Sequence, residues 1–240
     1  MNNDLYQAWV YLSTSPLLAL TLTLVAYQIG HWIYEKADKR PFFNPVLIAV
    51  LILVGLLMAT GTDYKTYFAG AQFVHFLLGP ATVALALPLY RQVNAVRRSA
   101  FALLVAVVAG GITAAVSAVG IAKLLGASDR TLISLAPKSV TAPVAMGISE
   151  QLGGLPSLTA VLVMLTGITG AMVTTYLLNA LRIKDWRVRG FATGVAAHGI
   201  GTARALQINE VAGAFSGLAM GINALASAIL LPLLVRWLLG

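Results

Sequence analysis

The most unusual stretch of this chain is Ser134-Leu135-Ala136-Pro137-Lys138-Ser139-Val140-Thr141-Ala142-Pro143. It places two prolines, a lysine and several hydroxyl side chains in a sequence that is otherwise strongly apolar. A proline lacks a backbone N–H and clashes with the preceding helical turn, so an unbroken helix is unfavourable here. At membrane depth, broken backbone is tolerated only inside protein or against a water-filled cavity, and an ionisable group marks a functional site. We therefore predict that this stretch forms half of a solute-binding site.

The composition indicates an all-α polytopic membrane protein. Of 240 residues, 59% are hydrophobic and 10% are charged, and the mean hydropathy is +0.85. A soluble domain usually carries about 25% charged residues. Because a spanning helix needs about 20 apolar residues, the chain has room for roughly eight such segments.

The net charge of +8 arises from 16 basic and 8 acidic residues. Most basic residues lie in short loops, where they set membrane orientation, so nucleic acid is not an expected partner. The chain has no cysteine, which excludes disulfides, thiol catalysis and Cys-metal sites. The N-terminus lacks the basic region and cleavage site of a signal peptide, so the first segment is expected to be retained.

Eight apolar segments are predicted between the charged loops. Pro16, Gly79-Pro80 and the opening stretch are expected to interrupt the first, third and fifth of them. Gly167 and Gly170 share one helix face and predict tight packing. The segments cover residues 5–34, 41–62, 66–90, 99–122, a fifth that ends near Glu150, 157–181, 190–209 and 211–239.

Four short matches indicate an internal repeat. They recur in the same order, shifted by about 110 to 120 residues. Internal duplication is typical of secondary transporters, whose site lies at the repeat interface. We predict repeats at residues 1–126 and 127–240. The matches are Ser13-x-x-Pro16 with Ser134-x-x-Pro137, Pro45 with Pro156, Gly79-Pro80-Ala81-Thr82 with Gly199-Ile200-Gly201-Thr202, and Ala100-Phe101 with Ala214-Phe215.

The basic loops add a constraint on topology. The most basic loops lie at residues 36–40, 91–98 and 182–189, and the positive-inside rule places all three in the cytoplasm. If every segment spanned once, the third loop would lie outside. A re-entrant fifth segment removes one membrane crossing and so places the third loop in the cytoplasm. A re-entrant first segment would in addition make the two halves inverted repeats.

Three ordered motifs resemble the LrgB family. They are Gly79-Pro80-Ala81-Thr82-Val83-Ala84, Pro137-Lys138-Ser139-Val140-Thr141-x-Pro143 and Ala197-His198-Gly199-Ile200-Gly201-Thr202-Ala203. The resemblance covers nearly the whole chain, in a family that includes bacterial LrgB and CidB proteins and the C-terminal part of the plastidial glycolate/glycerate translocator. It implies a carrier of small monocarboxylates such as glycolate, glycerate or pyruvate in the bacterial inner membrane. The older family label implies instead an antiholin-like regulator of murein hydrolase activity and lysis, with a separate LrgA/CidA-type membrane partner.

A small carboxylate needs hydrogen-bond donors and positive potential, which helix N-termini supply. Gly79-Pro80 and Pro137-Lys138-Ser139 are each expected to restart a helix, because proline is favoured in the first turn. Thr82 and Thr202 are expected to face one another across a pseudo-symmetry axis. The expected substrate-binding residues are Ala81, Thr82, Lys138, Ser139, Thr141, Gly199, Gly201, Thr202 and Arg204.

Each charged candidate has a structural alternative. Lys138 either binds the anion or extends to the membrane interface. Arg204 either binds the substrate carboxylate through its planar guanidinium group or forms a structural ion pair with Glu150 or Glu210. His198 either carries a coupling proton or is a buried, satisfied histidine, and Glu150 is the second proton-coupling candidate.

Enzyme sites are not indicated by the sequence. The three histidines show no HExxH spacing, Ser139 lacks a G-x-S-x-G elbow, and Gly199-x-Gly201 follows no predicted strand. No catalysis, metal or cofactor is expected. A homodimer in the lipid bilayer is the expected assembly, as the commonest closed arrangement. Asn44 and Asn223 are expected to hydrogen-bond between helices.

Overall fold

The computed structural model describes residues 16–84 and 86–239, and within these ranges every regular element is a helix. The chain divides after Ala84 into two compact units. An all-helical fold is therefore confirmed for the described residues. The division does not test the predicted repeat boundary at 126/127, because compactness and duplication are different properties.

The first unit contains α2 (Pro16–Lys36), a 3₁₀ turn η1 (Pro41–Phe43), α3 (Pro45–Thr60) and α4 (Tyr64–Ala84). Asn44 caps α3, since its side-chain oxygen accepts hydrogen bonds from the N–H groups of Val46 and Leu47 at 2.9 and 3.2 Å. The second predicted segment, residues 41–62, thus contains a helix that begins at Pro45. The side-chain oxygen of Asn44 thus serves the helix that it begins, and the expectation that Asn44 bonds between helices stays a prediction.

The predicted break at Gly79-Pro80 is not present. The α4 helix continues through Pro80 to Ala84, and α5 (Ala86–Arg91) follows. A proline removes one backbone donor from a helix, and at membrane depth neighbouring groups can compensate for that loss. Gly79-Pro80 therefore marks a position where the helix lacks one backbone hydrogen bond, and not the end of the helix.

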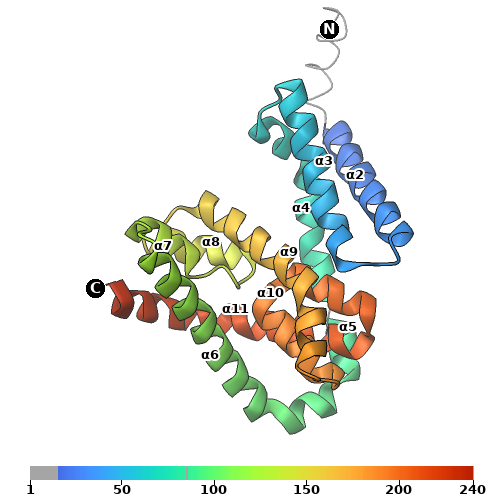
Figure 1. Ribbon diagram of the computed structural model, residues 1–240. Helices are drawn as coiled ribbons and strands as arrows, with labels where there is room; N and C mark the ends of the chain where they lie inside the picture. Colours follow the sequence, from blue (N-terminus) through green and yellow to red (C-terminus); the bar gives the residue numbers. More distant parts are fainter. Residues whose placement is uncertain (1–15, 85, 240) are drawn as a thin grey trace, which may run out of the picture. The chain divides into compact units, whose positions relative to one another are not determined.

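The second unit contains α5, α6 (Val93–Leu124), α7 (Asp129–Leu135), α8 (Ala142–Gln151), α9 (Pro156–Ala180), α10 (Trp186–Ile208) and α11 (Glu210–Leu239) (Figure 1). The α10 and α11 helices pack closely because glycine faces backbone: a Cβ at Gly190 would lie 2.0 Å from the Ala212 carbonyl oxygen. Beside this contact lies a core of Val107, Phe191, Val195, Phe215 and Ala219.

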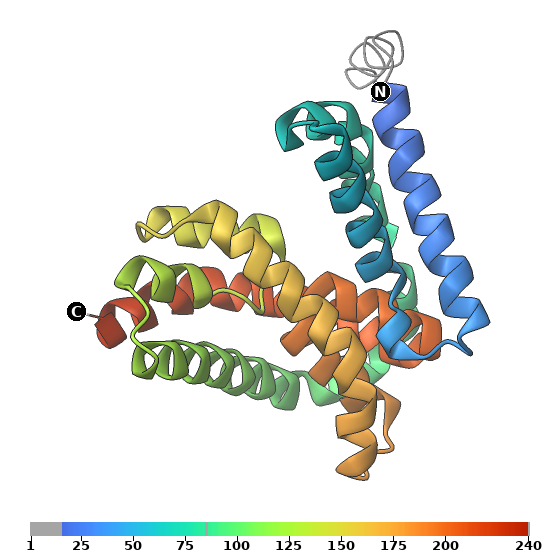
Figure 2. The same ribbon diagram turned by 45° about the horizontal axis from the view of Figure 1, so that its top comes forward.

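The fifth predicted segment is two short helices, α7 and α8, separated by a non-helical connection at residues 136–141. Figures 1 and 2 show α7 beside the ends of α6 and α11. Leu132 of α7 packs there with Val119 and Val235 in one buried cluster. The predicted interruption of this segment is confirmed.

Four of the described helices are long and apolar enough to cross a membrane: α2, α6, α9 and α11. The chain is therefore a multi-pass membrane protein, as the composition predicts. The other predicted segments also contain helix, but α7 and α8 are too short to span alone, and α10 carries a kink at its centre. Residues 5–15 of the first predicted segment, including Ser13, lie outside the described residues.

Candidate functional site

Two interruptions of helical backbone lie in the second unit. The first is the α7–α8 connection, and the second is His198 in α10, whose φ and ψ are 41° and −132°. A positive φ is costly for a residue with a side chain, so the surrounding packing must hold His198 in this conformation. A break in the helix therefore lies directly before Gly199-x-Gly201.

Lys138 and Ser139 lie in the middle of the α7–α8 connection. The half-buried Lys138 directs its Nζ to the Ser139 Oγ at 3.2 Å, and Ser139 itself is buried. The new helix begins at Ala142 after Thr141, with Pro143 in its first turn. The expectation that Pro137-Lys138-Ser139 starts the helix is therefore wrong, because the chain first makes two tight turns, closed by bonds from Lys138 N–H to the Leu135 carbonyl and from Val140 N–H to the Pro137 carbonyl.

His198 is held by α9 through a single ring nitrogen. Its Nε2 lies 2.9 Å from the Val163 carbonyl oxygen. Because a carbonyl only accepts, this contact requires the proton on Nε2. Gly167 makes room for the ring, since a Cβ there would lie 2.6 Å from His198 Cε1, and a Cβ at Gly170 would lie 2.4 Å from Ala197 Cβ. The predicted tight packing of Gly167 and Gly170 is confirmed.

The hydroxyl of Thr202 is engaged inside the protein. It donates to the His198 carbonyl at 2.8 Å and shares a hydrogen bond with Ser216 Oγ at 2.9 Å. Thr202 is 1% exposed, so its hydroxyl holds the kinked backbone to α11. Gly199 is exposed, whereas Gly201 is buried against Ala197 and Thr193.

Asn223 of α11 connects the two interruptions. Its Nδ2 donates to the Ser139 carbonyl at 3.1 Å and to the Val195 carbonyl at 3.4 Å. One buried amide nitrogen thus contacts the backbone of the first break and the turn before the second. The expectation that Asn223 bonds between helices is confirmed.

A second buried network fixes the α7–α8 hairpin to α9. The Thr159 hydroxyl approaches the Ser134 carbonyl at 3.0 Å and Ser149 Oγ at 2.8 Å, while Ser134 Oγ accepts from the Leu155 N–H at 2.8 Å. Sequence analysis did not single out Ser149 or Thr159. Both are polar residues in apolar segments, which could have marked them as candidates. Their spacing in the sequence, however, does not show that the two side chains meet.

The remaining candidates are dispersed. Thr141 and Arg204 are half-buried, and Glu150 is exposed at the end of α8. Glu210 forms an exposed ion pair with Arg91 at 2.9 Å, which supports a surface role for Glu210. Ala81 and Thr82 lie in α4 of the first unit, and their side chains lie outside the described residues, so the facing of Thr82 and Thr202 stays a prediction. No group of three or more potential metal ligands occurs among the described residues.

A groove of about 990 Å³ extends from Lys138 and Ser139 to the connection before α10. It lies between α6, α9 and α10 and is mainly apolar, with Thr166 and Thr169 among its lining residues. At its other end Asp185 caps α10 and bonds to Arg187. These hydrogen bonds hold the pKa of Asp185 below its ordinary value, so the carboxylate stays ionised.

The model of the LrgB-like family matches residues 23–237, which is most of the chain and includes both helix breaks. The chain belongs to the LrgB family. The resemblance stated from the three motifs is thus confirmed. No solved structure matches this LrgB-family chain.

Relatives align with nearly the full length of this LrgB-family chain. It is 36% identical to the uncharacterized protein YxaC of Bacillus subtilis, over 92% of this chain and 96% of that one. It is 32% identical to the holin-like protein CidB of Staphylococcus epidermidis, over 91% and 95%. It is 28% identical to the antiholin-like protein LrgB of Bacillus mycoides, over 93% and 97%.

Proposed function

We propose that this chain is a secondary carrier of small monocarboxylates, such as glycolate, glycerate or pyruvate, in the bacterial inner membrane. One observation carries the proposal: Lys138 lies in a break between helices, at the inner end of a groove, and Asn223 joins that break to the backbone beside His198. A lysine among broken backbone at membrane depth is costly unless it serves a function.

The chemistry of the connection suits an anion. Lys138 supplies a cationic donor and Ser139 a hydroxyl, while the N-terminus of α8 begins at Ala142, close in sequence to both. Helix N-termini and ammonium groups both favour negative charge. Thr141, Gly199 and Arg204 stay proposed substrate-binding residues, and Thr202 and Gly201 are proposed to position the second break.

The helix boundaries support the proposed duplication. The α3 and α9 helices both begin at a proline of the predicted repeat, Pro45 and Pro156. The α6 and α11 helices, which carry the matched Ala100 and Ala214, have 32 and 30 residues. An inverted arrangement of the repeats at 1–126 and 127–240 stays part of the proposal.

Proton coupling is proposed to involve His198 and Glu150. The Nε2 of His198 is committed to the Val163 carbonyl, so a coupling proton would charge the ring at Nδ1. Glu150 is exposed at the end of α8 and would exchange protons with water. A homodimer is proposed for the assembled carrier.

A second candidate function is antiholin-like control of murein hydrolase activity and lysis, together with a separate LrgA/CidA-type membrane partner. The observation that favours it is the naming of the relatives, which are described as holin-like CidB and antiholin-like LrgB. The comparisons favour this second function over the carrier, whereas the site geometry favours the carrier.

Uptake by purified protein separates the two functions. Liposomes containing the chain would be given labelled glycolate, glycerate or pyruvate, with and without an inward proton gradient. Saturable, competitive uptake is the expected result, and dependence on the gradient would support coupling. If folded protein takes up none of the three while lysis in cells still depends on it and on the partner, the carrier proposal fails and the regulator stands.

A further inference from the structure

The groove of the second unit is larger than a small carboxylate requires. Its volume is about 990 Å³, and it is walled by α6 on one side and by α9 and α10 on the other. The walls between its two ends are mostly aliphatic or aromatic, formed by Leu103, Leu162, Leu165, Val173, Leu177, Val188, Phe191, Val195 and Phe215. The apolar stretch between the two ends suits hydrocarbon, whereas Lys138 and Ser139 place polar groups at the inner end.

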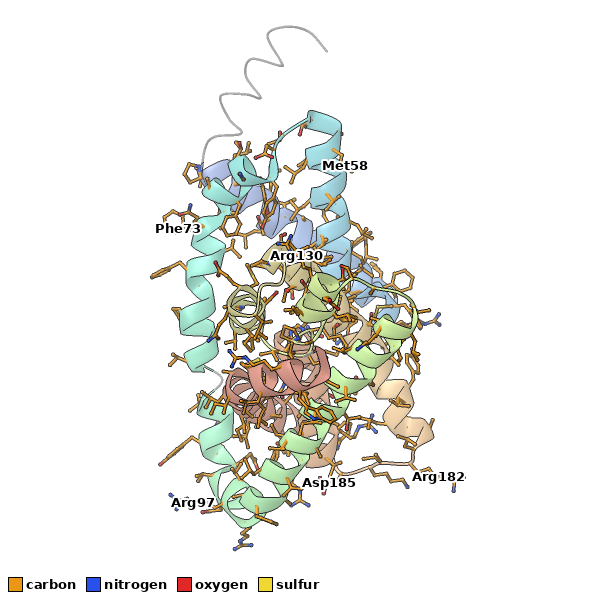
Figure 3. All side chains as sticks on the ribbon, turned by 90° about the vertical axis from the view of Figure 1, so that its left-hand side faces the viewer. Met58, Phe73, Arg97, Arg130, Arg182 and Asp185 are labelled. Carbon is orange, nitrogen blue, oxygen red and sulfur yellow. The ribbon has the colours of Figure 1, made fainter. Side chains whose placement is uncertain are left out.

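The outer rim of the groove lies close to several exposed basic residues. Ser99 of α6, Asp185 of the α9–α10 connection and Arg187 in the first turn of α10 line this end. Figure 3 shows Arg97, Arg182 and Asp185 at the same end of the second unit. Arg187 lines the rim and pairs with Asp185, and the exposed basic residues that lie within three positions of the lining residues Ser99 and Asp185 in sequence are Arg97, Arg98, Arg182 and Lys184.

From this juxtaposition we infer that the groove binds an anionic phospholipid, with its acyl chains between α6 and α9/α10 and its headgroup at the basic rim. Acyl chains are as apolar as leucine, so an apolar groove open to the bilayer fills with lipid without preferring one lipid. Selectivity must then come from the headgroup, and basic pockets between membrane helices recognise anionic headgroups. The inference does not depend on whether the chain is a carrier or a regulator.

A second copy of the chain is a poorer occupant of the groove. A parallel copy seated there would bring a second basic rim to the same membrane face, and like charges placed together disfavour association. A single phospholipid instead places its acyl chains against the apolar walls and its phosphate near the basic residues at the rim.

The inference is tested by native mass spectrometry of the purified full chain, titrated with phosphatidylglycerol or phosphatidylcholine. Wild type is expected to bind phosphatidylglycerol about tenfold more tightly or better. The double variant Arg97→Gln/Lys184→Gln should bring the ratio close to one. It leaves the Asp185–Arg187 pair at the start of α10 intact. Its matched control is Lys123→Gln/Arg130→Gln, which removes two cations distant in sequence from the rim and should keep the preference.

A groove-filling variant tests the tail site separately. Ala106 lines the groove, whereas Ala109 is also exposed on α6 but is not part of the groove lining. Ala106→Trp should lower the affinity for both lipids about fivefold or more relative to Ala109→Trp. Both variant proteins should be monodisperse by size-exclusion chromatography. The inference is overturned if wild type binds the two lipids equally, or if the rim variant keeps the wild-type ratio of the two affinities. It is also overturned if the two tryptophan substitutions change lipid binding equally. A lipid-free dimer broken only by Ala106→Trp would do so as well.

Discussion

At the scale of single residues, Lys138 is the group on which the carrier proposal rests. It lies half-buried between α7 and α8 and bonds to Ser139 Oγ. Among the described residues Lys138 forms no ion pair with a carboxylate, so the ammonium is suited to a bound anion.

We expect Lys138→Ala to lower carboxylate uptake by about 30-fold or more, since removing one partner of a buried charged pair costs about 2–5 kcal/mol. The measurement is initial uptake into liposomes with matched amounts of folded protein. Lys123→Ala is the control, because Lys123 lies exposed at the end of α6. Normal uptake by Lys138→Ala would remove the centre of the carrier proposal.

Gly167 is the residue that admits the His198 ring. In Gly167→Ala the new Cβ would lie 2.6 Å from His198 Cε1, so the ring must move away from the Val163 carbonyl. Overpacking of this kind costs about 1–3 kcal/mol, and we expect a lower midpoint of thermal unfolding in detergent.

Gly221→Ala is the matched control, because no atom lies within 4 Å of a Cβ at that helical position. It should leave the midpoint unchanged or raise it, as alanine is favoured over glycine in a helix by about 0.5–1 kcal/mol. Equal midpoints for the two variants would show that the contact between Gly167 and His198 is not tight.

At the scale of elements, Asn223 decides how the breaks in α7–α8 and α10 are held together. We expect Asn223→Ala to destabilise the second unit by about 1–3 kcal/mol, because it leaves buried carbonyls of Ser139 and Val195 without this donor. Thermal unfolding checks the result, with Asn179→Ala, an exposed site at the end of α9, as control. A midpoint equal to that of the control would mean that the two breaks are held independently.

The element boundaries show where sequence patterns were sufficient and where they were not. Prolines 45 and 156 begin helices, as their fixed φ and missing donor dictate. Pro80 lies inside α4 although the same rule predicted a break. A proline weakens a helix locally, and the surrounding packing determines whether the helix ends there.

At the scale of the whole second unit, the groove has a consequence for topology. Ser99 near the start of α6 and Asp185 after α9 line the same end of it. Two long helices, α6 and α9, separate them in sequence. Both positions then lie on one side of the membrane if the α7–α8 hairpin is re-entrant, as predicted. This geometry supports the prediction that residues 91–98 and 182–189 lie on one side of the membrane.

Single-cysteine labelling tests that topology directly, since the chain has no cysteine of its own. We expect Asn94→Cys and Lys184→Cys to react with a membrane-impermeant thiol reagent only when the cytoplasmic face is accessible. Both positions are exposed, so burial does not limit the reaction. Labelling of Lys184→Cys from the outer face would contradict a re-entrant α7–α8 hairpin.

The sequence by itself determined the membrane class, the helical content, the interruption in the fifth segment and the family. These properties follow from composition, from the missing proline donor and from short contiguous motifs. Only the tertiary structure determined that Asn223 contacts both breaks, that Thr202 is turned to Ser216, and that Thr159 meets Ser134 and Ser149. Such contacts join residues on different helices, and their formation depends on how the helices cross, which local propensity and spacing do not specify.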